Sequence, residues 1–235
     1  MVNTQTKKQN IFSLWNDEID FISNGSVLYW LPIYVDLLKI LNKQIKDGKA
    51  KRLKELAFID YGYMPLEDYT TANLGKALIR VTNIKGDGLI EMKDIKYVPD
   101  SDRSFEKLVK EGDSLIVQCG NTTGKIGFIT KKLEGLVFPS FCLLARTKKI
   151  NPYVLNVILN SSVVQLQLKR GMGYSSVRPN ITKPDVENLI IPILSNSEQK
   201  TIAEAFKEAL GLKEESEKKL QEAKDFVEDL IEKQT

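Results

Sequence analysis

The sequence predicts an α+β fold in which a twisted mixed-sheet domain is followed by a long C-terminal coiled-coil helix. Short runs rich in apolar and β-branched residues, separated by Gly- and Asp-containing turns, predict the sheet. Helix-type segments lie between these runs, and the last forty residues contain no proline and one glycine, Gly211. We therefore expect three parts: an N-terminal helical extension (residues 1–50), a domain (51–195), and a dimerisation or spacer helix (196–235).

The N-terminal part contains one clear helix signal. Pro32 suits the first turn of a helix that runs to about Lys46, with Asp36 near its start and lysines near its end, as the helix dipole favours. Asp47 and Gly48 then end this helix. Because it is apolar on more than one face, we expect it to pack against another part of the structure.

The middle part alternates strand and helix signals. Arg52–Ala57 is expected to form a short helical piece, followed by Phe58–Tyr63, which ends in a Gly-containing loop. A longer helix is expected over Val154–Leu168, after Asn151 as its N-cap, and the loop Lys169–Asn180 follows it. The expected strands are Ala77–Val81, Gly88–Met92, Ser114–Gln118, Gly127–Thr130, Val137–Ala145 and Leu189–Leu194.

The C-terminal part carries apolar residues at alternating spacings of four and three, interrupted in the middle by Lys213 and Ser216. A helix of about 36 residues is roughly 54 Å long. Such a helix cannot bury its own apolar stripe, so it needs a second helix or, alternatively, lies along its own domain. We predict pairing with a second helix through Ile202, Phe206, Ala209, Leu220, Ala223, Val227 and Leu230.

Composition excludes much conventional catalysis. The sequence contains no histidine, which removes Ser-His-Asp and Cys-His catalysis and the common imidazole zinc sites. Cys119 and Cys142 lack CxxC spacing and predict reduced thiols. The N-terminus is polar, and the longest apolar stretch, Val27–Leu38, is interrupted by Pro32 and Asp36. We therefore expect a cytoplasmic protein with no membrane association, no catalytic residues, no metal and no cofactor.

Positive charge is concentrated in the middle of the chain. Ser114–Pro184 holds ten Lys and Arg residues and one acid, Glu134, although the net charge of the whole chain is only +3. Such an imbalance is typical of a phosphate-binding surface, the alternative being a solvated surface that lacks acids. The lysines that we assign to DNA phosphates are Lys125, Lys131, Lys132, Lys148, Lys149, Lys169 and Lys183.

Two segments of this basic block offer donors suited to the bases of duplex DNA. The loop KRGMGYSSVRPN (Lys169–Asn180) combines planar arginine donors with two glycines that let the backbone approach a ligand. The segment GNTTGK (Gly120–Lys125) forms a polar tip between two expected strands. Arginine pairs with guanine, and asparagine with adenine, in the major groove. The base-reading candidates are Asn121, Thr122, Arg170, Tyr174, Arg178 and Asn180.

Three motifs resemble catalytic signatures without completing them. GNTTGK has the wrong glycine spacing for a P-loop, and Ile126 stands where Ser or Thr must follow the lysine. Asn151–Tyr153 lacks the second proline of an amino-methyltransferase tetrapeptide. Glu91–Lys93 has the Glu-x-Lys spacing of many nucleases, but no upstream aspartate with a matching strand context is evident. These motifs therefore predict no catalytic site.

Several stretches occur in a characteristic order. They are RVTNIKGDGLI (Arg80–Ile90), VKEGDSLIVQCGNTTGKIGFI (Val109–Ile129), NPYVLNVILNS (Asn151–Ser161) and GYSSVRPNITKPDVENLIIPI (Gly173–Ile193), which runs into SEQKTIA (Ser197–Ala203). Together they resemble half of a type I restriction–modification specificity subunit, namely one target recognition domain and one long helix. The usual proline-rich link before the Glu-Gln pair is replaced here by PILSNS, and residues 1–50 have no counterpart.

The resemblance implies a non-catalytic protein that dictates the DNA sequence on which partner methyltransferase and restriction subunits act. It also implies antiparallel pairing of long helices, so that two copies would read an interrupted palindrome in double-stranded DNA. Three alternatives stay open: the recognition part of a fused DNA methyltransferase, a DNA nuclease, and an assembly protein that binds nucleic acid without sequence choice.

Overall fold

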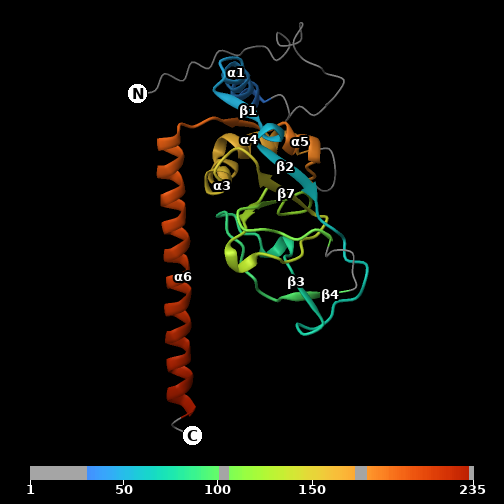
Figure 1. Cartoon of the computed structure of the whole chain (residues 1–235), viewed down its shortest axis with the longest axis vertical. Coiled ribbons are helices and arrows are strands. Elements are labelled where there is room, and N and C mark those ends of the chain that lie inside the picture. The colour runs from blue at the N-terminus through green and yellow to red at the C-terminus, as the bar shows by residue number, and fades with distance from the viewer. Residues whose placement is uncertain (1–30, 101–105, 173–178, 233–235) are drawn as a thin grey trace.

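The computed structural model describes residues 31–100, 106–172 and 179–232. These residues form an α+β domain with one long helix, α6 (Asn196–Glu232), along its side (Figure 1). The fold class predicted from the sequence is confirmed. Between the larger elements lie two short 3₁₀ helices, η3 (Val81–Asn83) and η5 (Lys131–Leu133).

A four-stranded sheet forms the centre of the domain, with the strand order β2-β7-β5-β6 and antiparallel pairing throughout. Ile116 lies opposite both Leu143 and Ile126, and Ile59 lies opposite Ala145. Because successive side chains of a strand point to opposite sides, the apolar strands give the sheet two faces to bury. Its strands are β2 (Ala57–Tyr61), β5 (Ser114–Val117), β6 (Ile126–Phe128) and β7 (Cys142–Thr147).

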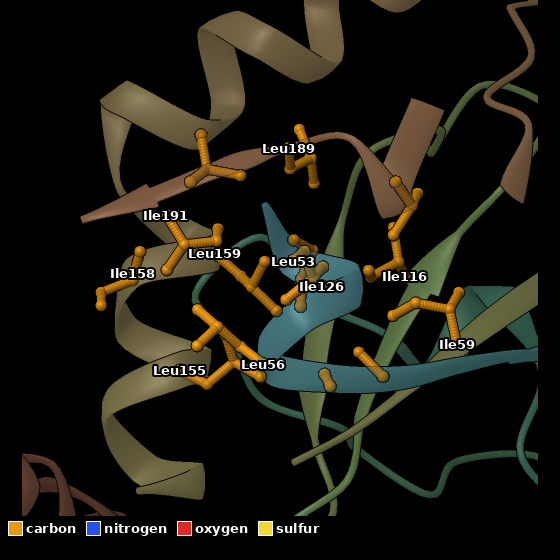
Figure 2. Packing of buried hydrophobic residues seen from close by; sticks show 14 of the residues in the cluster. Leu53, Leu56, Ile59, Ile116, Ile126, Leu155, Ile158, Leu159, Leu189 and Ile191 are labelled. Carbon is orange, nitrogen blue, oxygen red and sulfur yellow. The ribbon is translucent and has the colours of Figure 1, made fainter. Parts of the chain in front are cut away.

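Helices cover one face of the sheet. In Figure 2, Leu155 and Leu159 of α3 (Pro152–Asn160) lie beside Leu53 and Leu56 of α2 (Leu53–Leu56) in the larger apolar cluster. Burial of each such side chain stabilises the fold by about 1.5–3 kcal/mol. The other face of the sheet packs against connecting segments, through Ile79, Ile84, Ile129, Leu133 and Phe138.

A two-stranded ladder joins the two ends of the domain. Strand β1 (Ala50–Arg52) pairs antiparallel with β8 (Ile190–Pro192). Helix α1 (Pro32–Lys46) packs on this ladder through Leu41 and ends before Gly48, whose φ of +70° favours glycine. The helix predicted from Pro32 to Lys46 is therefore confirmed, and it packs against the domain.

Two parts of the sheet differ from the prediction, one through pairing with a distant strand and the other through a proline. Ala57, expected to end a short helical piece, and Phe58–Tyr61, for which no strand was predicted, form the edge strand β2. The predicted strand Val137–Ala145 begins as a strand only at Cys142. Pro139 lies in this interval, and it lacks the N–H that a continuous ladder needs. Val137 instead makes isolated bridges outside the main sheet.

A separate two-stranded sheet contains one strand that the sequence predicted in part and one that it did not predict. Strand β3 (Gly75–Leu78) overlaps the predicted strand at Ala77, but it pairs with β4 (Lys96–Pro99), which carried no strong signal. The predicted strand Gly88–Met92 contributes only an isolated bridge at Ile90.

The predicted helix Val154–Leu168 is two helices. Its first part, α3, ends at Ser161, where the backbone is extended (φ −69°, ψ 156°), and α4 (Ser162–Gly171) follows. The Ser161 hydroxyl donates to the Ile158 carbonyl (2.6 Å), which satisfies an acceptor at the end of α3. The N-cap prediction for Asn151 is confirmed, since its side chain accepts from the N–H of Tyr153 (3.0 Å). The short helix α5 (Lys183–Glu187) precedes β8.

The first half of α6 packs on the domain. Ala203 is buried, and Phe206 meets Phe128 and Tyr153 edge-on, with ring centroids 5.4 and 6.3 Å apart. Lys207 lies 4.7 Å from the centroid of the Tyr153 ring. These contacts fix the direction in which the helix leaves the domain.

The second half of α6 is exposed, and its last turns continue past the domain (Figure 1). The side chains there keep 44–64% of their surface accessible, which is high for large apolar residues. Among the described residues, no helix is long and apolar enough to cross a membrane. The exposed apolar residues are Leu220, Phe226, Val227, Leu230 and Ile231.

An ion pair between half-buried Arg146 and buried Asp113 fixes β7 to the segment before β5. The Arg146 guanidinium donates to both carboxylate oxygens of Asp113, from Nε at 2.8 Å and from Nη2 at 2.6 Å. Asp113 is 1% exposed and also accepts from the N–H of Lys110 (2.7 Å). The guanidinium additionally donates to the Leu108 carbonyl (3.2 Å). Removing Arg146 would leave the buried Asp113 carboxylate without its cation, with only the Lys110 N–H to stabilise it.

Arg146→Ala is therefore predicted to lower the free energy of unfolding by about 3 kcal/mol. Denaturant unfolding followed by circular dichroism measures the loss. Lys149→Ala is the matched control, because this exposed cation nearby in the sequence should change stability by no more than about 0.5 kcal/mol. A loss below about 1 kcal/mol for Arg146→Ala contradicts a structural role for the pair.

Candidate nucleic-acid interface

The antiparallel strand order gathers four chain segments at one end of the sheet. Strands β2 and β5 finish at this end, with Tyr61 and Val117, while β6 and β7 begin there, with Ile126 and Cys142. We call this the tip end of the sheet. The polar segment Gln118–Lys125, singled out in the sequence, connects β5 to β6 and therefore lies at the tip end.

Backbone hydrogen bonds join this segment to the end of the basic loop. The N–H of Ile181 donates to the Gln118 carbonyl (2.8 Å), and the N–H of Gly120 donates to the Pro179 carbonyl (3.3 Å). The Thr123 hydroxyl lies 2.6 Å from the Gly120 carbonyl and 3.1 Å from that of Pro179. These contacts bring together the two candidate recognition segments, which are far apart in the sequence.

Helix α4 supports the same segment from behind. Gly124 has a φ of +84°, and a Cβ atom there would lie 2.7 Å from Cε of Met172. The Gln165 amide nitrogen donates to the Gly124 carbonyl (3.2 Å) and to the Leu159 carbonyl (3.1 Å). The positive φ favours glycine at position 124. The tip is thus held by hydrogen bonds and packing on its inner side.

The structure brings together three of the six base-reading candidates. Asn121 and Asn180 are exposed and Thr122 is half-buried, all on the joined segments of the tip end. Arg170 is half-buried at the end of α4 and lines a groove of about 610 Å³ between α1, α4 and α5. Tyr174 and Arg178 lie outside the described residues.

The seven phosphate candidates fall into separate places. Lys125 precedes β6 and Lys183 begins α5, so both are near the tip end, and Lys169 is exposed at the end of α4. Lys148 and Lys149 follow β7 at the opposite end of the sheet, where their N–H groups donate to the Leu56 carbonyl (2.8 and 3.3 Å).

Lys131 and Lys132 lie beyond β6, which is the opposite edge strand from β2. Lys131 forms an ion pair with Glu134, and Lys132 forms one with Glu214 of α6 at 3.0 Å. Their ammonium groups are already paired within the chain. The assignment of all seven lysines to DNA phosphates stays a prediction.

Sequence reasoning missed an aromatic and basic row along the edge strand β2. Phe58 and Tyr61 are 45% and 37% exposed. Lys107 pairs with Asp60 (2.9 Å) and donates to the Tyr61 carbonyl (3.0 Å). The sequence Ala57–Tyr61 begins with three apolar residues in a row, so the alternation of buried and exposed side chains along β2 becomes visible only in the structure.

The predicted helix-pairing residues are divided between the two halves of α6. Ile202 and Phe206 pack on the chain's own domain, whereas Leu220, Val227 and Leu230 are exposed, as are Ala209 and Ala223. A groove of about 730 Å³ separates α6 from the domain. Its walls include Leu210 and Leu220 on the helix, and Leu89, Met92 and Leu136 on the domain.

The Glu-x-Lys motif forms an ion-pair cluster. The Glu91 carboxylate lies 3.1 Å from the ammonium of Lys93, 3.5 Å from Lys213 and 3.9 Å from Lys85. The hydrogen bond from Lys93, with support from Lys213, lowers the pKa of Glu91 below its ordinary value. Within the described ranges, no group of three or more Asp, Glu, Cys or His residues could hold a metal. Glu91 instead helps to attach α6 to the domain.

The chain matches the type I restriction modification DNA specificity domain over residues 45–224. Comparison with curated proteins gives no match. Among solved structures, a chain from work on "complex assembly" and conformational transition of the type I R-M system has 18% identity and a TM-score of 0.53, covering 73% of this chain and 44% of that one. The type IIG restriction endonuclease BpuSI has 10% identity and a TM-score of 0.54, covering 72% of this chain and 28% of that one.

A third structure, the HsdS subunit from Thermoanaerobacter tengcongensis, has 16% identity and a TM-score of 0.49, covering 76% of this chain and 44% of that one. The chain thus spans less than half the length of the solved structures it matches. At these identities the likeness to the first two structures shows the fold, while the match over residues 45–224 covers most of the sequence and shows the family. The chain belongs to the family of type I restriction modification DNA specificity domains.

Proposed function

We propose that this chain binds duplex DNA sequence-specifically as the specificity component of a type I-like restriction–modification complex. The observation that carries the proposal is the joining of the Gly120–Gly124 tip to Pro179–Asn180 at one end of the sheet. Exposed amide side chains on a backbone held by several hydrogen bonds are suited to reading base edges, because their positions are fixed before DNA binds. Membership of a DNA specificity family supports the same role.

The chemistry of recognition follows from the side chains at the tip end. The amides of Asn121 and Asn180 can each donate and accept, as the N6 and N7 edge of adenine requires. Thr122 adds a further donor at the tip end. Arg170, which lies outside the tip end, and Arg178 and Tyr174, which lie outside the described residues, remain candidates through their chemistry, since arginine pairs with guanine. Lysines beside these groups would bind phosphates and set the register without selecting a sequence.

The chain itself supplies no chemical step in this proposal. Methylation would come from a methyltransferase subunit, and cleavage from a restriction subunit, both acting where this chain places them. The complex would work in the cytoplasm, where its DNA lies. If the domain instead belonged to a fused methyltransferase, the tip end would contact DNA in the same way.

The long helix would set the number and spacing of the recognition domains. We propose that two copies pair antiparallel through the exposed half of α6, with Leu220, Val227 and Leu230 in the seam. A twofold-symmetric pair would present two identical tip ends to an interrupted palindrome. The exposure of these residues supports the pairing, because large apolar side chains clustered on a solvent-exposed helix are typical of an interaction surface.

Base reading and phosphate binding can be separated by salt titrations. Asn180→Ala is predicted to cost about 1–3 kcal/mol on the preferred duplex and much less on a mixed-sequence duplex. Lys148→Ala is predicted to weaken binding to both duplexes alike and to lower the slope of log K against log salt by about one. Fluorescence anisotropy at several salt concentrations measures both effects.

Lys132→Ala is the comparison for Lys148→Ala, since its ammonium is paired with Glu214. If Lys132→Ala lowers the salt slope as much as Lys148→Ala does, Lys132 binds phosphate. If the salt slope is unchanged, Lys132 serves to attach α6 to the domain. Equal losses on both duplexes for Asn180→Ala contradict base reading by the tip end.

Helix pairing is tested by charge substitution. Leu220→Asp with Val227→Asp is predicted to dissociate the assembly, because each buried apolar side chain contributes about 1.5–3 kcal/mol. Leu212→Asp is the matched control, since this leucine is 60% exposed on the same helix but lies outside the seam. Analytical ultracentrifugation should show a dimer for the control and a monomer for the double variant. A wild-type chain that stays monomeric at micromolar concentration, with or without a methyltransferase subunit, rules out the seam.

A further inference from the structure

Phe58 occupies an unusual position for a large aromatic residue. Its neighbours on β2, Ala57 and Ile59, are 2% and 3% exposed, whereas the Phe58 ring is 45% exposed. It lies on the edge strand of the central sheet. Single exposed apolar residues are common in proteins, so the exposure of Phe58 indicates a function only if the groups around the ring point to a ligand.

Two lysines from distant parts of the chain converge on this ring. The ammonium of Lys148 is 5.6 Å from the ring centroid and that of Lys183 is 6.0 Å away. Lys148 follows β7, and Lys183 is the first residue of α5. Significant cation–π contacts occur about once per 70–80 residues in proteins. Two lysines on one exposed ring are therefore more than the average frequency would place there. We call Phe58, Lys148 and Lys183 the Phe58 seat.

The seat carries positive charge with little acidic compensation. Among the described residues, Lys148 has no acidic partner, and Lys183 has one, Glu187, at 3.8 Å. Two like charges held around one ring repel each other, and an anion between them would remove this cost. The seat therefore matches a ligand with a negative group beside an apolar surface. The sugar–phosphate backbone of DNA has this combination.

The seat is continuous with the tip end. The N–H of Lys183 lies 3.4 Å from the Tyr61 hydroxyl at the end of β2, and Asn180 comes three residues before Lys183. A five-residue strand is about 17 Å long, and the rise of a DNA strand is about 3.4 Å per nucleotide. A strand read at Asn121 and Asn180 could thus continue along β2 for about five nucleotides.

We propose that the Phe58 seat binds the DNA backbone next to the bases read at the tip end, with the ring against a deoxyribose and the lysines on the flanking phosphates. This inference rests on the proposed DNA-binding function. Phe58 has no hydrogen-bond donor and no charge, so its contribution to DNA affinity should not depend on the base sequence of the DNA. It also predicts that Phe58 and Lys148 act together, because the ring positions the ammonium.

The test uses the full chain with a mixed-sequence duplex over a range of salt concentrations. Phe58→Ala should weaken binding roughly fivefold with little change in the salt slope. Lys148→Ala should lower the slope by about one. The double variant should lose less than the product of the two single losses, because the two side chains serve one contact. Phe58→Trp should keep the affinity, and Phe58→Leu should not, since leucine has no ring for the cations.

Tyr69→Ala is the matched control, because Tyr69 is 54% exposed but lies outside the seat. Binding by Phe58→Ala that equals that of Tyr69→Ala would overturn the proposal. So would unchanged DNA binding by Phe58→Ala together with lost binding of a methyltransferase subunit, which would assign the seat to a protein partner. If the wild-type chain shows no sequence preference but the Phe58 variants still lose affinity, the specificity role fails while the seat stands.

Discussion

The arrangement of the candidate interface depends on one constraint, the antiparallel order β2-β7-β5-β6. Antiparallel pairing places the end of each strand beside the start of its neighbour. Segments after β2 and β5, and before β6 and β7, are therefore forced to the same end of the sheet. The Gln118 carbonyl then accepts from the N–H of Ile181, which adds the end of the basic loop. A surface assembled from distant parts of the sequence thus rests on a rigid sheet that is buried on both faces.

The same packing explains how a recognition surface can be held at a defined angle to a spacer. Phe206 against Phe128 and Tyr153 attaches the start of α6, and the Lys213–Glu91 ion pair adds a second point of attachment further along the helix. Two separated attachments restrict rotation of the helix about its contact with the domain. If the exposed half pairs with a second copy, the distance between two tip ends would be set by helix length and would change little with solution conditions.

Much of the fold was predictable where the signals are local. The helix from Pro32 to Lys46, the cap at Asn151 and the long final helix depend on residues near one another in the sequence, and all three were confirmed. Strand β2 was missed because pairing with the distant strand β7 defines it. The break at Ser161 was missed because residues on both sides of it are apolar and pack in the same cluster, so the sequence pattern continues across it.

The candidate site shows the same division. Charge counting found the basic block, and residue chemistry picked out both segments that meet at the tip end. The sequence could not sort the lysines, because position relative to the sheet decides whether an ammonium faces the tip end or, like that of Lys132, a glutamate of α6. The cluster around Phe58 could not be predicted for a related reason: its two lysines come from the segment after β7 and from α5, which are distant from Phe58 in the sequence.

The central claim is that the tip end selects the DNA sequence. Selection of duplexes from a random pool, run in parallel with the wild-type chain and an Asn121→Ala/Asn180→Ala variant, tests it most directly. The account predicts that the wild-type chain enriches an interrupted palindrome and that the variant loses preference at particular positions within each half-site while still binding DNA. Enrichment of the same motif by both proteins would contradict the claim and place sequence reading elsewhere on the domain.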